Sequence, residues 1–477
     1  MRVIIVGAGF GGIAAAIELR RRGIADVTIL EKADRPGGTW FHNTYPGAAC
    51  DVPSHLYSFS FAQRYDWVRL CPTQPDISRY VHDVVAEHGL SDMIETGTHV
   101  TACRWDDAGR RWTVETSRGE RTADAVIVAT GQLHQPATPR LPGEFAGHSF
   151  HSAAWDHAYD LRGKRVAVIG TGASAVQFVP PVAEQAAHTT VFQRTGNWFL
   201  PRRNHRYPRA YRMLVRRVPA LQRARRKGLF WYLESLTASI RHPQTLGRLL
   251  AIRSRLFMRY QLRAHPELRE RIWPDYTFGC KRVLFSSFFL PTLARPDVEV
   301  VTEPIERLAP TGVVTADGRT HEVDCIIYGT GFRTTDFMFP MEVTGAGGRS
   351  LAEAWKGGAH AHLGIAVPGF PSLYVMYGPN TNTSGGSIIT YLEAQAGYIR
   401  QALELQRDRA AALSVRPEVE AASDREVQAR FAGTAWTRCD SWYRDESGRI
   451  VTNWPGYMRE YLEQTKRLDP GDFEFVS

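Results

Sequence analysis

Two short glycine-rich segments are the first residues whose types and spacing indicate chemistry. GAGFGG runs from Gly7 to Gly12, and GTGASA runs from Gly170 to Ala175. In such a loop the first glycine permits a tight turn and the second lets the backbone approach a pyrophosphate. The third small residue lets the next helix pack against the strand before it. The predicted contacts to two bound dinucleotides are Gly7, Gly9, Gly12, Gly170, Gly172 and Ser174.

The residue that ends the next strand indicates which kind of nucleotide each loop binds. Glu31 and Arg194 stand at the same distance from the first glycine of their loops. A carboxylate accepts hydrogen bonds from ribose hydroxyls and repels a 2′-phosphate, whereas a guanidinium holds that phosphate by charge-assisted hydrogen bonds. We therefore expect Arg194, with Thr195 after it, to bind a 2′-phosphorylated nucleotide, and Glu31 to bind one without that group.

These residues must be positioned by strands and helices on either side of each loop. Short apolar strands lead into the loops and follow the intervening helices: Val3–Val6, Val27–Leu30, Arg165–Ile169 and Thr190–Gln193. The order strand, glycine loop, helix, strand is the unit of a doubly wound sheet. The predicted fold class is α/β, with two Rossmann-like dinucleotide-binding domains. Two further apolar strands, Ala125–Ala129 and Val323–Tyr328, end at Thr-Gly and are both expected to join the first sheet.

A linker and a loop between these units carry further polar and aromatic residues. FAGHSFHSAAWD, from Phe145 to Asp156, lacks a helical apolar face and is predicted to be irregular. GGTWFHNTYPGAACD, from Gly37 to Asp51, is too rich in Gly, Pro and Asn for a regular element and is expected to lie along the first cofactor. By themselves, His151 and Trp155 would more often be packing and surface residues, and Asp51 a carboxylate that caps a turn.

The spacing of these residues resembles a known family. F-x-G-x-x-x-H-x-x-x-W-D is met by Phe145, Gly147, His151, Trp155 and Asp156, and resembles the fingerprint of type I Baeyer-Villiger monooxygenases. G-G-x-W-x-x-x-x-Y-P-G-x-x-x-D, with Trp40, Tyr45 and Asp51, resembles a second motif of that family. The Lys281–Arg282 pair and the segment Ser441–Tyr443 also match. A purely structural role for Trp442 is nearly as well favoured.

The resemblance implies FAD in the first unit and NADPH in the second. It implies that NADPH reduces FAD, that reduced flavin and O2 give a C4a-peroxyflavin, and that this species converts an apolar ketone to an ester or lactone. Arg282 would stabilise the developing negative charge, Asp51 would orient Arg282, and His151 would couple domain motion to catalysis. Further cofactor contacts implied are Gly38, Thr39, Trp40, Tyr45, Gln132, Lys281, Asn380 and Trp442. Phe288 and Phe289, and the loop at Gly385 and Gly386, depart from the family pattern.

The domain layout follows from these motifs. Residues 1–144 and 325–477 are expected to form the FAD-binding domain, and residues 145–157 the linker. Residues 158–201 and 276–324 are expected to form the NADPH-binding domain, interrupted by a basic helical insertion at residues 202–275.

The insertion holds most of the positive charge. The chain has net charge +9, and the stretch from Arg202 to Arg271 holds eighteen arginines and one lysine against Glu234, Glu267 and Glu270. With interspersed leucines and aromatic residues it predicts basic amphipathic helices. A solvated helical cap is the favoured interpretation, and a role in contacting a membrane surface or an anionic substrate comes second. Nucleic-acid binding is not expected, since no nucleic-acid fold motif accompanies the charge.

Composition and cysteine spacing exclude other classes. Hydrophobic residues make up 43% and charged residues 22% of 477 residues, typical of a globular chain with more than one domain. The six cysteines are scattered singly, which argues against a disulfide framework, a zinc site and a dithiol redox centre. We expect no metal, no signal peptide, a reducing cytoplasm, and a monomer or weak homo-oligomer.

Competing functions remain open at this point. The nearest is an N- or S-oxygenating flavin monooxygenase, which would use the protonated hydroperoxide. A flavin disulfide reductase fits less well, because no cysteine pair follows the first glycine loop. A non-catalytic flavin or membrane adaptor is opposed by the joint presence of Asp51, Lys281 and Arg282.

Overall fold

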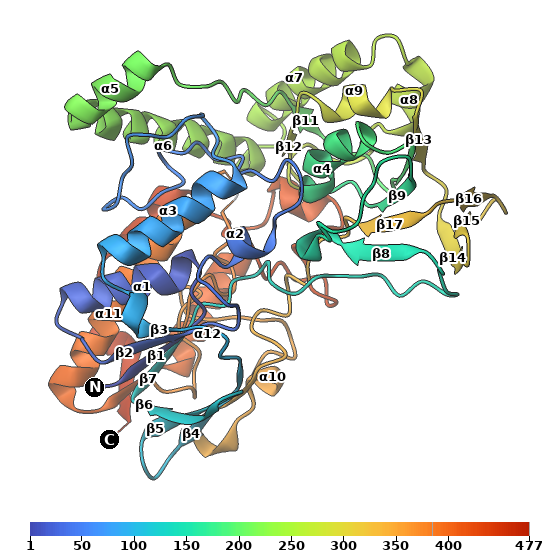
Figure 1. Cartoon of the computed structure of the whole chain (residues 1–477). Coiled ribbons are helices and arrows are strands. Elements are labelled where there is room, and N and C mark those ends of the chain that lie inside the picture. The colour runs from blue at the N-terminus through green and yellow to red at the C-terminus, as the bar shows by residue number, and fades with distance from the viewer. Residues whose placement is uncertain (384, 477) are drawn as a thin grey trace.

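The computed structural model describes residues 1–383 and 385–476, so that Ser384 and Ser477 lie outside the described residues. Its core is two parallel sheets, each with helices packed on it (Figure 1). Both sheets are built from short strands that are apolar on both faces, which is the composition of parallel strands covered by helices. The predicted α/β class with two dinucleotide-binding folds is confirmed.

The first sheet has the strand order β19-β7-β1-β2-β3 and all its neighbours are parallel. Its strands are β1 (Val3–Val6), β2 (Val27–Leu30), β3 (Ile94–Glu95), β7 (Ala125–Val128) and β19 (Leu373–Val375). The helices around it include α1 (Phe10–Arg21), α3 (Gln74–Glu87) and α11 (Ile388–Arg409). Because α1 packs against α11, this unit joins the beginning of the chain to its last quarter.

The second sheet has the order β13-β10-β9-β17-β8 and is also parallel. Its strands are β8 (His148–His151), β9 (Arg165–Ile169), β10 (His188–Phe192), β13 (Val298–Val301) and β17 (Cys325–Tyr328). Helices α4 (Ala173–Ala183) and α9 (Phe289–Leu293) pack together beside it.

Two sequence-based expectations are wrong here. The strand ending at Tyr328 was expected in the first sheet, but β17 pairs with β9 and β8 and so belongs to the second. The linker was expected to be irregular, yet its residues His148–His151 form the edge strand β8, followed by the 3-10 turn η2 (Ser152–Ala154). An edge strand needs only one partner, and backbone pairing with β17 outweighs the weak local preference of HSFH.

Smaller elements complete both units. An antiparallel meander β4-β5-β6 with β18 beside it covers the first sheet, and the antiparallel β14-β15-β16 extends from the second. Their bounds are β4 (Val100–Asp106), β5 (Arg111–Thr116), β6 (Gly119–Ala123), β18 (Glu342–Thr344), β14 (Ile305–Ala309), β15 (Gly312–Thr315) and β16 (Thr320–Glu322). The remaining elements are α2 (Thr39–His42), η1 (Ser91–Met93), β11 (Phe199–Leu200), β12 (Leu284–Phe285), η3 (Ala346–Gly348), α10 (Leu351–Ala354), β20 (Ala412–Val415), α12 (Pro417–Ala429), η4 (Ala435–Arg438), α13 (Met458–Gln464), η5 (Pro470–Asp472) and β21 (Phe473–Val476).

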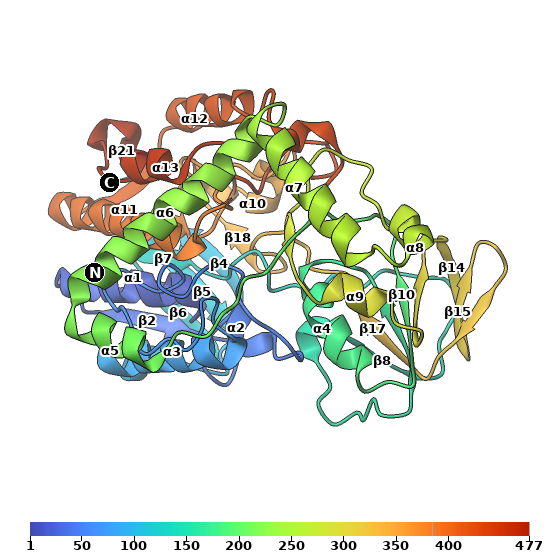
Figure 2. The same cartoon turned by 90° about the horizontal axis from the view of Figure 1, so that it is seen from above.

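The basic insertion forms α5 (Arg209–Arg217), α6 (Pro219–Arg241), α7 (Leu246–Gln261) and α8 (Pro266–Arg271), as the sequence predicted. The helices α5, α6 and α7 run across one side of the molecule, over both units (Figure 2). On the first unit, Nη1 of Arg226 in α6 donates to the carbonyls of His55 at 2.8 Å and Ser58 at 2.9 Å. On the second, α7 packs against β11 and α9. Within the described ranges no helix is long and apolar enough to cross a membrane.

Candidate active site

The two glycine loops share one backbone geometry. Gly7 and Gly170 adopt φ angles of +104° and +103°, which L-residues with side chains rarely adopt. A Cβ atom on Gly7 would lie 2.8 Å from the Ala129 carbonyl oxygen, and one on Gly170 would lie 2.6 Å from that of Gly329. A Cβ on Gly12 would lie 2.0 Å from the carbonyl oxygen of Gly7. The tight turn and the close helix packing predicted for these glycines are therefore present.

Glu31 is held at the end of β2 by backbone amides. Its Oε2 accepts a hydrogen bond from Ala8 N at 2.7 Å, and its Oε1 accepts one from Ala33 N at 2.9 Å. The side chain is buried. Each carboxylate oxygen has a second lone pair, so a ribose hydroxyl can still donate to Glu31.

The loop from Gly37 to Asp51 lies between the two units. A Cβ on Gly38 would lie 3.0 Å from the Cα of Gly9, so the loop closes over the first glycine turn. Oε1 of Gln177, in α4, accepts a hydrogen bond from the Tyr45 hydroxyl at 3.3 Å and one from Ala49 N at 3.0 Å. The expectation of no regular structure is wrong in one place, since residues Thr39–His42 form the single-turn helix α2. Gly38 starts that turn with a φ of +55°.

Other side chains of this loop have mixed exposure. Trp40 is half-buried and its indole N–H donates to the Tyr57 hydroxyl at 2.8 Å. Thr39 is exposed at the first position of α2, and Ser174 is half-buried in the first turn of α4. These residues line the approach to the two glycine turns, and their cofactor contacts stay predictions.

Arg282 and Asp51 form an ion pair. Nη2 of Arg282 lies 2.6 Å from Oδ2 of Asp51, with the two side chains 46% and 23% exposed. Burial raises the pKa of the Asp51 carboxyl, but the charge and hydrogen bond of Arg282, with a further contribution from Arg202, lower that pKa overall. The charge of Asp51 raises the pKa of the Arg282 guanidinium, against the effect of burial. Both groups are therefore ionised, and Arg282 keeps donors free for another anionic oxygen.

Arg202 was not predicted as a site residue. Its Nη2 donates to the carbonyl of Cys50 at 3.0 Å, which places its charge beside Asp51. The only signal in the sequence was that Arg202 begins the insertion just after β11. That signal does not distinguish it from the other arginines there.

Lys281 lies near Arg194, although the residues are far apart in the sequence. Burial lowers the pKa of the Lys281 ammonium, and the positive charge of Arg194 lowers it further. Arg194 is exposed and Thr195 half-buried, directly after β10. Two cations brought together in this way can attract a dianion, and the predicted contact with a 2′-phosphate stays a prediction.

His151 ends β8 beside the second Thr-Gly crossing. Its Nδ1 accepts a hydrogen bond from Ala153 N at 3.1 Å, and its ring is 6.0 Å from that of Phe332. Burial lowers the pKa of the imidazole, and the Gly331 carbonyl raises it by less. The neutral ring therefore carries its proton on Nε2, which has no hydrogen-bond partner among residues 1–383 and 385–476.

Gln132 and Asn380 mainly hold backbone segments together. The side-chain amide of Gln132 donates to the carbonyls of Tyr377 at 3.1 Å and Gly378 at 3.2 Å. That of Asn380 donates to the carbonyls of Ile450 at 2.9 Å and Asn453 at 3.0 Å. The backbone N–H of Asn380 also donates, to the Val451 carbonyl at 2.8 Å, so a cofactor contact of Asn380 is left to its oxygen atoms.

The segment predicted to fold over the nicotinamide is placed next to Arg282. Trp442 is 40% exposed, and its ring is 4.2 Å from that of the buried Tyr443. Burial raises the pKa of the Tyr443 hydroxyl, and the positive charge of Arg282 lowers it by less. The sequence singles out Tyr443 only as part of the motif, whereas the structure buries its hydroxyl where the charge of Arg282 acts on it.

A disulfide bond joins Cys280 to Cys439 across 159 residues. It connects the segment that carries Lys281 and Arg282 to the segment that carries Trp442. The sequence argues against a disulfide framework and does not predict this single bond. Single cysteines so far apart give no spacing signal, and only the tertiary fold brings them together.

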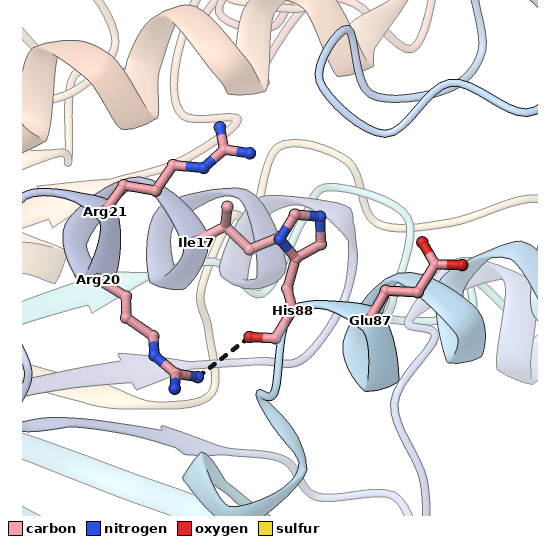
Figure 3. A pocket seen from close by; sticks show the side chains of 5 residues that line it. All are labelled: Ile17, Arg20, Arg21, Glu87 and His88. Atoms are coloured by element: carbon pink, nitrogen blue, oxygen red, sulfur yellow. Dashed lines mark hydrogen bonds between the residues drawn. The ribbon is translucent and has the colours of Figure 1, made fainter.

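Four large apolar residues of the sequence, Trp198, Trp231, Phe288 and Phe289, could line a pocket for a bulky apolar substrate, but they do not gather in one place. Trp198 and Phe289 are core residues of the second unit. Trp231 and Phe288 are exposed, at 48% and 72%. A shallow hollow of about 270 Å³ is lined by Ile17, Arg20, Arg21, Glu87 and His88, and Arg20 donates to the His88 carbonyl across it (Figure 3). None of the predicted site residues lines this hollow, so we assign it no role.

Comparisons with known proteins cover the whole chain. The family model described as pyridine nucleotide-disulphide oxidoreductase matches residues 4–217. A Baeyer-Villiger monooxygenase of Streptomyces coelicolor is 44% identical over 486 aligned residues, which cover 100% of this chain and 93% of that protein. The solved structure of an oxidized steroid monooxygenase bound to NADP is 30% identical, with a TM-score of 0.87 over 99% of each chain. The structure of OTEMO complexed with FAD and NADP is 26% identical, with a TM-score of 0.89 over 100% of this chain and 99% of that one.

Proposed function

The chain belongs to the Baeyer-Villiger monooxygenases, and from this premise we propose that it inserts one oxygen atom of O2 next to the carbonyl of an apolar ketone, giving an ester or lactone. The protein is an FAD-containing, NADPH-dependent monooxygenase. We propose in addition the class of ketone, the side of its carbonyl at which oxygen is inserted, and the role of each residue.

The residues present fit both cofactors. Around FAD, Gly7, Gly9 and Gly12 leave the backbone open toward a pyrophosphate, and Glu31 has lone pairs for ribose hydroxyls. Around NADPH, Gly170 and Gly172 repeat the turn, and Arg194 with Lys281 would hold the 2′-phosphate. When bound, the two cofactors supply the electrons and the activated oxygen.

The chain's own contribution is to orient the ketone and stabilise charge. Arg282 would donate N–H bonds to the substrate oxygen as it becomes anionic, which lowers the energy of the transition state more than that of the ground state. Asp51 would keep the Arg282 guanidinium in one orientation, and its negative charge would keep that guanidinium protonated. Trp442 and Tyr443 would exclude water from the reacting atoms. His151 would link the position of the second unit to the first.

The observation that carries this proposal is the Arg282–Asp51 ion pair, at 2.6 Å and partly accessible. An arginine fully paired in the core could not reach a substrate, and one freely solvated would be too mobile to orient it. We also propose that residues 1–144 and the chain after Tyr328 hold FAD, and that the segments around β9 and β17 hold NADPH.

The test is product analysis with isotopically labelled O2. The purified holoenzyme is given NADPH and a panel of cyclic, aromatic and steroid-like ketones, together with an aryl methyl sulfide. We expect an ester or lactone that has gained one labelled oxygen. Oxygenation of the sulfide with no reaction of any ketone would instead establish the heteroatom-oxygenating alternative.

A further inference from the structure

The outward face of α7 carries a stripe of apolar side chains. Leu249, Ile252, Leu256 and Tyr260 recur with helical spacing, and Leu249, Leu256 and Tyr260 are 63%, 61% and 63% exposed. The opposite face of the helix, made by Gly247, Ala251, Ser254 and Met258, is buried. The helix is thus apolar on the side that faces away from the protein, which is the reverse of an ordinary surface helix.

Basic side chains flank this stripe, and no acidic side chain of α5, α6 or α7 is exposed. Across α5, α6 and α7 the exposed basic residues are Arg209, Arg216, Arg217, Arg223, Lys227, Arg248, Arg253, Arg255 and Arg259. The acidic residue of these helices is Glu234, which is buried, with Oε1 accepting a hydrogen bond from Arg459 N at 2.9 Å. The outward charge of this layer is therefore of one sign.

The neighbouring helices add further exposed apolar residues. Met213 and Leu214 in α5, and Trp231 and Tyr232 in α6, are all exposed. The three helices lie on the same side of the molecule, at the top of Figure 1 and toward the viewer in Figure 2. Exposed apolar patches on this scale mark an interaction surface.

We propose that the outward face of α5, α6 and α7 docks on an anionic lipid bilayer. Leucine, tryptophan and tyrosine side chains would enter the headgroup region, while arginines at their flanks pair with lipid phosphates. The charge and the exposed apolar residues of this face favour a lipid bilayer over a second copy of the chain or a nucleic acid. A second copy of the chain would bring two positive faces together, and a nucleic acid would leave the exposed leucines in water.

The test is co-sedimentation of the full-length holoenzyme with vesicles of phosphatidylcholine alone or with phosphatidylglycerol. We expect binding to the anionic vesicles only, and a decrease with added salt, because salt screens the attraction. Equal binding to both vesicle types, or binding to neither, would overturn the proposal.

Paired variants locate the surface. Arg248→Glu with Arg253→Glu is expected to reduce partitioning by about 30-fold or more, since each basic residue at such a surface contributes about 1 kcal/mol. The matched control, Arg118→Glu with Arg307→Glu, makes the same change of charge at exposed positions on other elements and is expected to bind like the wild type. Equal losses in both pairs would mean that only net charge matters, and would refute a docking face.

The apolar stripe is tested separately. Leu249→Gln with Leu256→Gln is expected to lower partitioning roughly tenfold or more, because both side chains lose apolar burial. These positions are exposed, so the fold and the turnover of a soluble ketone should be unchanged. If the double variant instead abolishes self-association of the free protein in light scattering, the occupant is a second copy and the membrane proposal fails.

Discussion

Nη2 of Arg282 lies 2.6 Å from Oδ2 of Asp51, although 231 positions separate them in the chain. Asp51 ends a loop that contacts the first glycine turn and helix α4 of the second unit, and Arg282 follows the whole basic insertion. The ion pair therefore forms only when both units and the insertion have taken their places. The presence of this ion pair therefore indicates that the two units and the insertion are correctly assembled.

Arg282→Ala should retain FAD but lose about two orders of magnitude in ketone turnover, the effect of removing roughly 3 kcal/mol of charge stabilisation. Asp51→Ala should act in the same direction less severely, because the cation remains but loses its orientation. Product formation and hydrogen peroxide release are measured with NADPH in excess. Arg162→Ala, in a fully exposed ion pair, is the control and should behave like the wild type. A wild-type rate of product formation in Arg282→Ala would remove this residue from the active site.

Arg194→Ala should reduce the preference for NADPH over NADH by roughly 10- to 150-fold, which corresponds to a charge-assisted contact of roughly 1.5 to 3 kcal/mol. Lys281→Ala should add to this loss, since the two cations share one site. KM for both nucleotides is measured at saturating ketone. Arg253→Ala, exposed on α7, serves as the control. An unchanged ratio of KM values in Arg194→Ala would sink the 2′-phosphate assignment.

Cys280→Ser and Cys439→Ser should each lower the free energy of unfolding by roughly 2–4 kcal/mol, because the disulfide restricts the unfolded chain. The double variant should lose no more than either single variant. Alkylation of the denatured wild-type protein without reductant should label Cys50, Cys71, Cys103 and Cys325 alone. Labelling of all six cysteines would show that the bond is open in the isolated protein.

The stability of the protein should fall as the pH drops from 6.5 toward 4. Burial, together with the charges of Arg225 and Arg226, lowers the pKa of His55 from 6.5 to about 4. Between those values the unfolded chain binds a proton at His55 and the native state does not, so acidification favours unfolding, by about 3 kcal/mol in total. Denaturant titrations of His55→Gln should show a flatter decline with pH. The exposed His99→Gln is the control, and equal slopes in both variants would contradict this origin.

The local parts of the fold could be predicted from the sequence because their causes are local. A glycine turn, a short apolar strand and the residue that follows it are set by a few neighbouring positions, so the sequence alone locates the turn at Gly7 and the places of Glu31 and Arg194 after their strands. Their cofactor contacts stay predictions. The amphipathic helices of the insertion were found for the same reason.

The parts that were missed depend on contacts between distant segments. Strand β17 joins the second sheet because it pairs with β9. The segment His148–His151 becomes the edge strand β8 because it pairs with β17. The Cys280–Cys439 bond and the place of Arg202 beside Asp51 likewise need the assembled fold. The spacing of apolar residues along the sequence carries no signal of such long-range contacts. The Asp51–Arg282 pairing was anticipated through the family resemblance rather than through spacing.

The strand order β19-β7-β1-β2-β3 leaves the first sheet incomplete while the chain is being synthesised. Its first strands leave the ribosome early, but their neighbour β19 and the helix α11 that packs on α1 lie near the end of the chain. At a synthesis rate of roughly 5–20 residues per second, the edge of β7 stays unpaired for on the order of tens of seconds. During that time the nascent sheet exposes an apolar edge, which is a hazard for aggregation. Slow translation or scarce chaperones should therefore lower the yield of this protein more than its final stability suggests.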